Sequence, residues 1–111
     1  FQMISKMLAD ATAEYLAARA LTYESAAALD RGEDADLALN LGTSAKLIAP
    51  KMATKVAMDG IQILGGYGYT KEYPVERYMR DAKLNEIGAG TNEVMRVILA
   101  RELDKGHFPG I

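Results

Sequence analysis

Apolar side chains recur at steps of three and four residues through the first third of the chain. Residues 1–31 contain neither Pro nor Gly, and Ala, Leu and Met are interspersed there with charged residues. This spacing predicts one long amphipathic helix, which Gly32 is expected to end. Its apolar positions are Ile4, Leu8, Ala11, Tyr15, Ala18, Ala26 and Leu29.

A second run of helical spacing continues to about residue 64. Asp34 or Asp36 is expected to cap its start. Pro50 interrupts the run. Because proline lacks a backbone donor and clashes with the preceding turn, the sequence predicts a kink near residues 46–50 or two abutting helices. The apolar positions are Ala38, Leu41, Ala45, Ile48, Met52, Val56 and Ile63.

The last part of the chain is richer in glycine. The run from Gly65 to Tyr69 is expected to be a turn whose backbone closely approaches another group. A short helix should follow from Pro74. After a break at Gly88-Ala89-Gly90, a final helix should extend to about Leu103. The sequence therefore predicts an all-α fold, an antiparallel bundle of two long helices and two shorter ones.

Composition narrows the function classes. The 111 residues correspond to one domain. A net charge of −2 does not favour binding to the negatively charged backbone of nucleic acid. No Cys is present and His107 is the only His, so we expect no metal site, disulfide or thiol nucleophile. No apolar run approaches the ~18 residues of a membrane span. We expect the six Met residues to fill the core and His107 to be exposed.

The segment from Gly88 to Glu93 is the strongest candidate for chemistry. Glycines flank a small residue where a helix begins, and either Thr91 or Asn92 is expected to cap that helix. Free backbone N–H groups at such a point could donate to a carbonyl oxygen that gains negative charge, or to a phosphate. An ordinary tight turn between two helices explains the same residues equally well.

Four ordered motifs nevertheless resemble the C-terminal signature of the flavin-dependent acyl-CoA dehydrogenases. The two long helices are similar to the same family, so the resemblance covers essentially the whole chain. It implies a single C-terminal helical domain over residues 1–111, and we expect the family's N-terminal helical domain and middle β-domain to precede Phe1. The four motifs are Gln62 to Tyr69, Glu72 to Arg77, Arg80 to Lys83, and Ile87 to Glu93 followed by Arg96.

The resemblance also assigns roles to individual residues. It implies FAD as the cofactor and an acyl-CoA as the substrate. Ala89 and Gly90 match the substrate-contacting turn, where the Ala89 N–H would polarise the thioester carbonyl. The positions that match flavin contacts are Gln2, Gln62, Ile63, Leu64, Gly65, Gly66, Thr91, Asn92 and Glu93.

The sequence departs from the commonest family pattern at Ala89, where many members carry the catalytic Glu. Isovaleryl-CoA and long-chain members also have a small residue there and take their Glu from a helix that would precede Phe1. No catalytic residue is therefore expected within this chain. The alternative is an inactive binding or assembly module of the same fold.

The resemblance further implies an electron-transfer-flavoprotein-like acceptor and a homo-oligomer, either a dimer or a tetramer. It places the enzyme in the cytoplasm, or in the mitochondrial matrix of a eukaryote.

Overall fold

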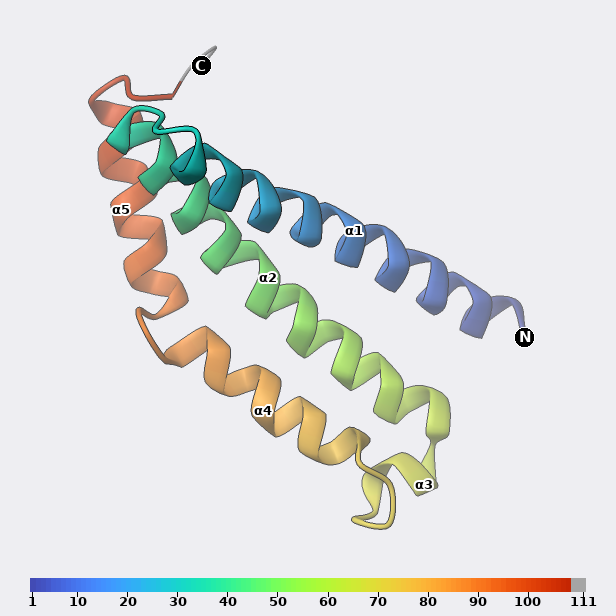
Figure 1. Cartoon of the computed structure of the whole chain (residues 1–111). Coiled ribbons are helices and arrows are strands. Elements are labelled where there is room, and N and C mark those ends of the chain that lie inside the picture. Colours follow the sequence, from blue (N-terminus) through green and yellow to red (C-terminus); the bar gives the residue numbers. More distant parts are fainter. Residues whose placement is uncertain (109–111) are drawn as a thin grey trace.

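The computed structural model describes residues 1–108 and is helical throughout that part of the chain (Figure 1). Two long helices and two shorter ones form the structure, as predicted, and a one-turn helix is added between them. The predicted all-α fold is therefore confirmed. The helices are α1 (Gln2–Asp30), α2 (Ala35–Leu64), α3 (Gly66–Tyr69), α4 (Val75–Ile87) and α5 (Asn92–Asp104).

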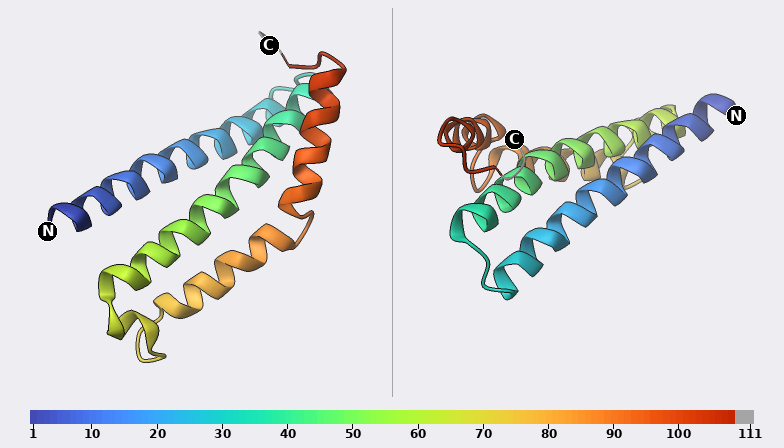
Figure 2. Two further views of the ribbon diagram at one scale, coloured as in Figure 1. Left: turned by 180° about the vertical axis from the view of Figure 1, so that it is seen from behind. Right: turned by 90° about the horizontal axis from the view of Figure 1, so that it is seen from above.

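Helices α1 and α2 lie side by side and antiparallel, and α4 packs on the other side of α2 (Figures 1 and 2). The reversal between α1 and α2 uses Gly32, whose φ of +68° is left-handed backbone that glycine adopts without a steric cost. Small side chains form much of the buried core, which lets neighbouring helix backbones approach closely. The buried alanines are Ala18, Ala28, Ala38, Ala45 and Ala82.

Helix α2 continues without interruption through Pro50, so the expectation of two abutting helices was wrong. Pro50 is buried, and α2 packs against both α1 and α4. Burial of the helix against α1 and α4 compensates for the backbone hydrogen bond that proline cannot make, since tertiary packing contributes most of a helix's stability in a protein.

The glycine-rich run after α2 is only partly the predicted turn. Gly65 has a φ of +61° and reverses the chain, but residues 66–69 then form α3. The close backbone approach expected here occurs within the chain itself. A Cβ atom on Gly68 would lie 2.5 Å from the carbonyl oxygen of Ile61, so this glycine lets α3 pack directly on α2.

Helices α4 and α5 meet at an angle and bring the C-terminal part of the chain back along α2 (Figure 2). Pro74 precedes α4 as predicted. Thr91 is the residue that caps α5, because its Oγ1 accepts a hydrogen bond from the Val94 N–H at 3.2 Å. Cap formation fixes the direction in which α5 leaves the turn.

The methionines were expected to fill the core, and only Met95 among them is buried. Met3 and Met58 are 83% and 54% exposed, which corrects that expectation for these two residues. They belong to a larger set of exposed apolar side chains, many of them on α1, which contacts only α2 extensively. Within residues 1–108, no helix has both the length and the apolarity needed to cross a bilayer.

Candidate functional site

The turn between α4 and α5 has an unusual backbone. Ala89 has a φ of +55° and Gly90 a φ of +101°. Ala89 is the only described residue other than glycine with a positive φ, a conformation that costs an alanine on the order of 1–3 kcal/mol. Such a conformation persists only where the surrounding structure holds it.

Two backbone donors of this turn are free. The N–H groups of Ala89 and Gly90 donate to no acceptor within residues 1–108, whereas the neighbouring Gly88 N–H donates to the Leu84 carbonyl at 2.7 Å. Ala89 is exposed and Gly90 is half-buried, so a ligand can reach the turn. The turn leads directly into α5, whose N-terminus carries the positive end of the helix dipole. This arrangement suits an acceptor atom with negative charge.

A lysine from α2 is hydrogen-bonded to the turn. The Lys46 Nζ donates to the Asn85 carbonyl at 2.6 Å and to the Gly90 carbonyl at 3.2 Å. Asn85 lies in the last turn of α4, where carbonyl groups lack partners within the helix and a positive charge is favourable. Lys46 therefore ties the end of α4 and the turn to the middle of α2.

A carboxylate from α4 is hydrogen-bonded to the first residue of α5. Glu86 Oε1 accepts a hydrogen bond from the Asn92 side-chain amide at 3.1 Å. Glu86 Oε2 accepts one from the Thr54 hydroxyl at 3.0 Å and lies 3.1 Å from the Lys83 Nζ. The hydrogen bond from Lys83 is the largest of the effects that hold the pKa of Glu86 below its ordinary value. One charged carboxylate thus connects α2, α4 and α5.

The first residue of α5 has one unused acceptor. Asn92 is 5% exposed, and its Oδ1 has no hydrogen-bond partner within the described part of the chain. Thr91 is half-buried and Glu93 is exposed, with a side chain 3.9 Å from Arg96. The unpaired Asn92 oxygen fits a ligand that offers a hydrogen-bond donor, as a flavin nucleotide does.

The other predicted flavin contacts lie elsewhere. Residues 62–66 end α2 and begin α3, so they lie at the opposite end of α4 from the turn at Ala89 (Figure 1). Ile63 is half-buried, while Gln62, Leu64, Gly65 and Gly66 are exposed. A Cβ atom on Gly65 or Gly66 would meet no atom within 4 Å, which leaves open space for a ligand beside this backbone.

The structure therefore does not bring all the predicted contact residues together. Gln2 is exposed in the first turn of α1, at the same end of the α1–α2 pair as residues 62–66 (Figure 1). Ala89 and Gly90 are adjacent to Thr91, Asn92 and Glu93 at the other end of α4. The two sets of predicted contact residues therefore lie at opposite ends of α4.

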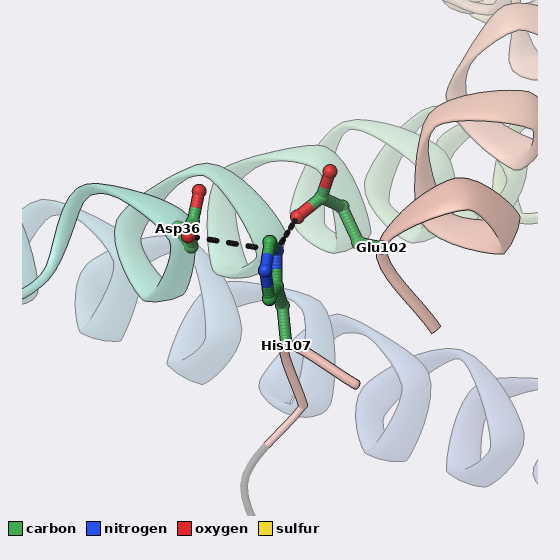
Figure 3. Close-up of side chains that lie close together, drawn as sticks. All are labelled: Asp36, Glu102 and His107. Atoms are coloured by element: carbon green, nitrogen blue, oxygen red, sulfur yellow. Dashed lines mark hydrogen bonds and ion pairs between the residues drawn. The ribbon is translucent and has the colours of Figure 1, made fainter. Parts of the chain in front are cut away.

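A third polar cluster joins the tail after α5 to the start of α2. Figure 3 shows His107 between Glu102 and Asp36, and its Nδ1 lies 2.6 Å from Glu102 Oε2 and 3.5 Å from Asp36 Oδ2. His107 is half-buried, so the expectation that it is exposed was wrong. The hydrogen bond with His107 is the main effect that lowers the pKa of Glu102.

This cluster has the residue types of a metal site, because one ligand atom from each of Asp36, Glu102 and His107 lies within 4.8 Å of the others. Lys105 also pairs with Glu102, at 3.3 Å. The buried Glu102 carboxylate thus already has two cationic or proton-donating neighbours. We therefore interpret the cluster as a structural contact that holds His107 against the start of α2.

Sequence reasoning found the turn and its cap but missed Lys46 as a contact. The sequence separates Lys46 from Asn85 and Gly90 by 39 and 44 residues, so no local spacing could have revealed it. Glu86 lies only three residues before Ala89 in the sequence. Its links to Thr54 and Asn92 depend on how α2, α4 and α5 pack.

Comparison with known proteins agrees with this fold. The chain is 43% identical to cyclohexane-1-carbonyl-CoA dehydrogenase of Geobacter metallireducens over 104 residues, which are 94% of this chain and 27% of that protein. Butyryl-CoA dehydrogenase from Megasphaera elsdenii matches in structure with a TM-score of 0.86 at 42% identity, over 93% of this chain and 26% of that one.

The FAD complex of PigA matches with a TM-score of 0.87 at 27% identity, over 94% of this chain and 26% of that one. The chain thus spans about a quarter of the length of these proteins. The family described as "Acyl-CoA dehydrogenase, C-terminal domain" matches residues 1–103. The helices and the glycine-rich turn described above therefore belong to the C-terminal domain of the acyl-CoA dehydrogenase family, of which this chain is a member.

Proposed function

We propose that this chain is the C-terminal domain of a longer FAD-dependent enzyme that introduces an α,β double bond into an acyl-CoA thioester. One observation carries the proposal. The N–H groups of Ala89 and Gly90 are free, accessible and held at the N-terminus of α5. The similarity to acyl-CoA dehydrogenases over residues 1–103 supports a thioester as the group that these donors bind.

The turn would act on the thioester carbonyl. A hydrogen bond from the Ala89 N–H, together with the positive end of the α5 dipole, stabilises negative charge on the carbonyl oxygen. That charge develops when the proton on the α-carbon is removed, so the donors lower the barrier to proton removal. Loss of one such donor typically costs about 3–4 kcal/mol of transition-state stabilisation.

Two separate parts of the chain would hold FAD. At the α5 end these are Thr91, Asn92 and Glu93, where free backbone donors and the unpaired Asn92 oxygen offer polar partners. At the α3 end they are Gln2 and residues 62–66, where Gly65 and Gly66 leave the backbone open. When bound, FAD supplies the acceptor for the hydride that leaves the β-carbon.

The base that takes the α-proton would come from outside residues 1–111. The side chain at the turn is the methyl group of Ala89, which accepts no proton. Glu86, the acidic residue that precedes the turn, already accepts hydrogen bonds from Thr54 and Asn92 and pairs with Lys83. We therefore assign the base to a Glu of the longer polypeptide, as in the isovaleryl-CoA type of enzyme.

The proposal extends to partners. An electron-transfer-flavoprotein-like protein would reoxidise the flavin, and a neighbouring subunit would contribute the flavin that residues 62–66 contact. The exposed apolar side chains of α1 fit a domain that is covered by other parts of a larger assembly. The cytoplasm or mitochondrial matrix would supply the acyl-CoA.

The test uses the full polypeptide that contains this chain. After purification, its flavin content is measured, and butyryl-, isovaleryl- and palmitoyl-CoA are each added without oxygen. We expect bound FAD, loss of the oxidised-flavin absorbance with at least one thioester, and the matching 2-enoyl-CoA as product. A protein that binds FAD and acyl-CoA but reduces no flavin would instead favour the inactive binding module.

A further inference from the structure

The conformation of the turn at Ala89 is held by two side chains that lie outside it. Lys46 binds the Gly90 carbonyl, and Glu86 accepts a hydrogen bond from the Asn92 amide. Both contacts lie within three residues of the two free N–H groups. Neither Lys46 nor Glu86 is among the residues that the family resemblance assigns to substrate or flavin.

Both side chains anchor the turn to the same helix. Lys46 belongs to α2, and the Glu86 carboxylate accepts a hydrogen bond from Thr54, two turns further along α2. Helix α2 packs against α1, α4 and α5, so it is the best-supported element of the fold. A turn fixed to α2 at two points keeps its donors in place when α4 or α5 moves slightly.

The chemistry of the two residues suits this task. Lys46 is half-buried and forms no ion pair with a carboxylate within residues 1–108. Its ammonium group instead donates hydrogen bonds to two backbone carbonyl oxygens. Glu86 has a side chain only 14% exposed and uses both carboxylate oxygens. Together these hydrogen bonds tie the turn to defined groups of α2 and α4, which favours one geometry of the turn.

We propose that Lys46 and Glu86 are positioning residues, which hold the Ala89 and Gly90 N–H groups in the direction needed to polarise the thioester carbonyl. This inference rests on the proposed function. Their effect is on the transition state, since misdirected donors still allow the acyl-CoA to bind but stabilise the developing charge less.

The test replaces each residue in the full FAD-loaded enzyme. Lys46→Met and Glu86→Ala should each slow flavin reduction at saturating acyl-CoA by about tenfold to a hundredfold. The KM for acyl-CoA should change much less. The conservative variants Lys46→Arg and Glu86→Gln should recover most of the rate, because they keep hydrogen-bonding groups of similar reach. The control variants Lys105→Met and Glu24→Ala remove exposed charged residues far from the turn and should reduce flavin at the wild-type rate.

A spectroscopic readout separates positioning from a simple loss of stability. The enoyl-CoA product of the fastest substrate is labelled with ¹³C at its thioester carbonyl and bound to the oxidised enzyme. In the wild type, the carbonyl stretch should lie below its frequency in solution. In Lys46→Met and Glu86→Ala it should return toward the solution value, although FAD content stays unchanged.

Two results would overturn the inference. In one, the two variants reduce flavin at the wild-type rate. In the other, they are slow but keep the wild-type carbonyl frequency, which would mean that they act elsewhere. A wild-type enzyme without flavin reduction and without a carbonyl shift would overturn the proposed function, and this inference with it. The wild-type measurement therefore distinguishes the two failures.

Discussion

The carboxylate of Glu86 and the side-chain amide of Asn92 are joined by a hydrogen bond of 3.1 Å across the turn that links α4 to α5. Asn92 is almost fully buried, so this bond fixes the first residue of α5 relative to the last turn of α4. The left-handed backbone of Ala89 lies between the two residues. The hydrogen bond between Glu86 and the buried Asn92 side chain therefore spans the strained turn.

This contact predicts a pH dependence of stability. The pKa of Glu86 is held below its ordinary value of 4.5, mainly by the hydrogen bond from Lys83. A carboxyl group whose pKa is lower in the folded state stabilises the fold fully above its unfolded pKa, and this contribution is lost as the pH falls through the folded pKa. Wild type should therefore exceed Glu86→Gln in stability at neutral pH, and the difference should disappear in acid. Urea unfolding of both proteins across this range measures it, and a constant difference would contradict the assignment.

Gly68 and Gly66 form a matched pair for testing how α3 packs. A Cβ atom at Gly68 would lie 2.5 Å from a backbone oxygen of Ile61, whereas one at Gly66 would meet nothing within 4 Å. Gly68→Ala should lower the free energy of unfolding by about 1–3 kcal/mol, because backbone must shift. Gly66→Ala should change it by less than about 0.5 kcal/mol. Equal effects in denaturant unfolding would show that α3 does not pack on α2 in this way.

The chain by itself should retain little or no FAD. The two sets of predicted contacts lie at opposite ends of α4, so the chain offers each flavin only part of its binding surface (Figure 1). Absorbance of the purified 111-residue chain after incubation with FAD tests this expectation, and stoichiometric bound flavin would contradict it.

Gln62 tests the second set of contacts in the full enzyme. Its side chain is exposed at the end of α2, where loss of one polar contact should weaken FAD binding by roughly 1 kcal/mol, about a fivefold rise in Kd. Gln62→Ala is compared with Glu24→Ala, which removes an exposed side chain on α1. An unchanged FAD dissociation constant in Gln62→Ala would count against this contact.

Exposed apolar side chains on α1 predict self-association of the chain. Leu8, Leu16 and Tyr23 are 55%, 53% and 62% exposed. Large exposed apolar patches are rarely left uncovered in soluble proteins. We expect dimers or larger species, formed in some cases by exchange of helices between chains. Light scattering at increasing concentration tests this, and a strictly monomeric chain without dye-accessible apolar surface would contradict it.

Local features of the sequence predicted the elements well. Thr91 caps α5 and Pro74 precedes α4 because both effects depend on neighbouring residues. Pro50 shows one limit of local reasoning, since α2 continues through it and does not divide into two abutting helices. The close backbone approach predicted for the run from Gly65 to Tyr69 occurs at Gly68, but the sequence could not show that Ile61 is the neighbour.

The parts of the candidate site that depend on neighbouring residues could likewise be predicted from the sequence. The turn at Ala89 and its entry into α5 follow from adjacent glycines and a cap, and the family resemblance supplied the thioester. The contacts of Lys46 join residues far apart in the sequence, so they depend on the three-dimensional packing of α2 against α4. The partial burial of His107 likewise depends on Glu102 and Asp36 meeting in space (Figure 3).

The central claim is that this domain supplies the turn that binds the thioester, while the proton acceptor comes from outside residues 1–111. Anaerobic reduction of the bound flavin by acyl-CoA, in the full enzyme, tests it most directly. Glu86→Gln should keep the rate within about tenfold of wild type, a barrier change under ~1.4 kcal/mol. Replacement of the external Glu should slow reduction by several orders of magnitude, and adding Ala89→Glu to that variant should restore part of the rate, since the turn faces the substrate. A Glu86→Gln enzyme with intact FAD and no flavin reduction would contradict the claim and place the base within this chain.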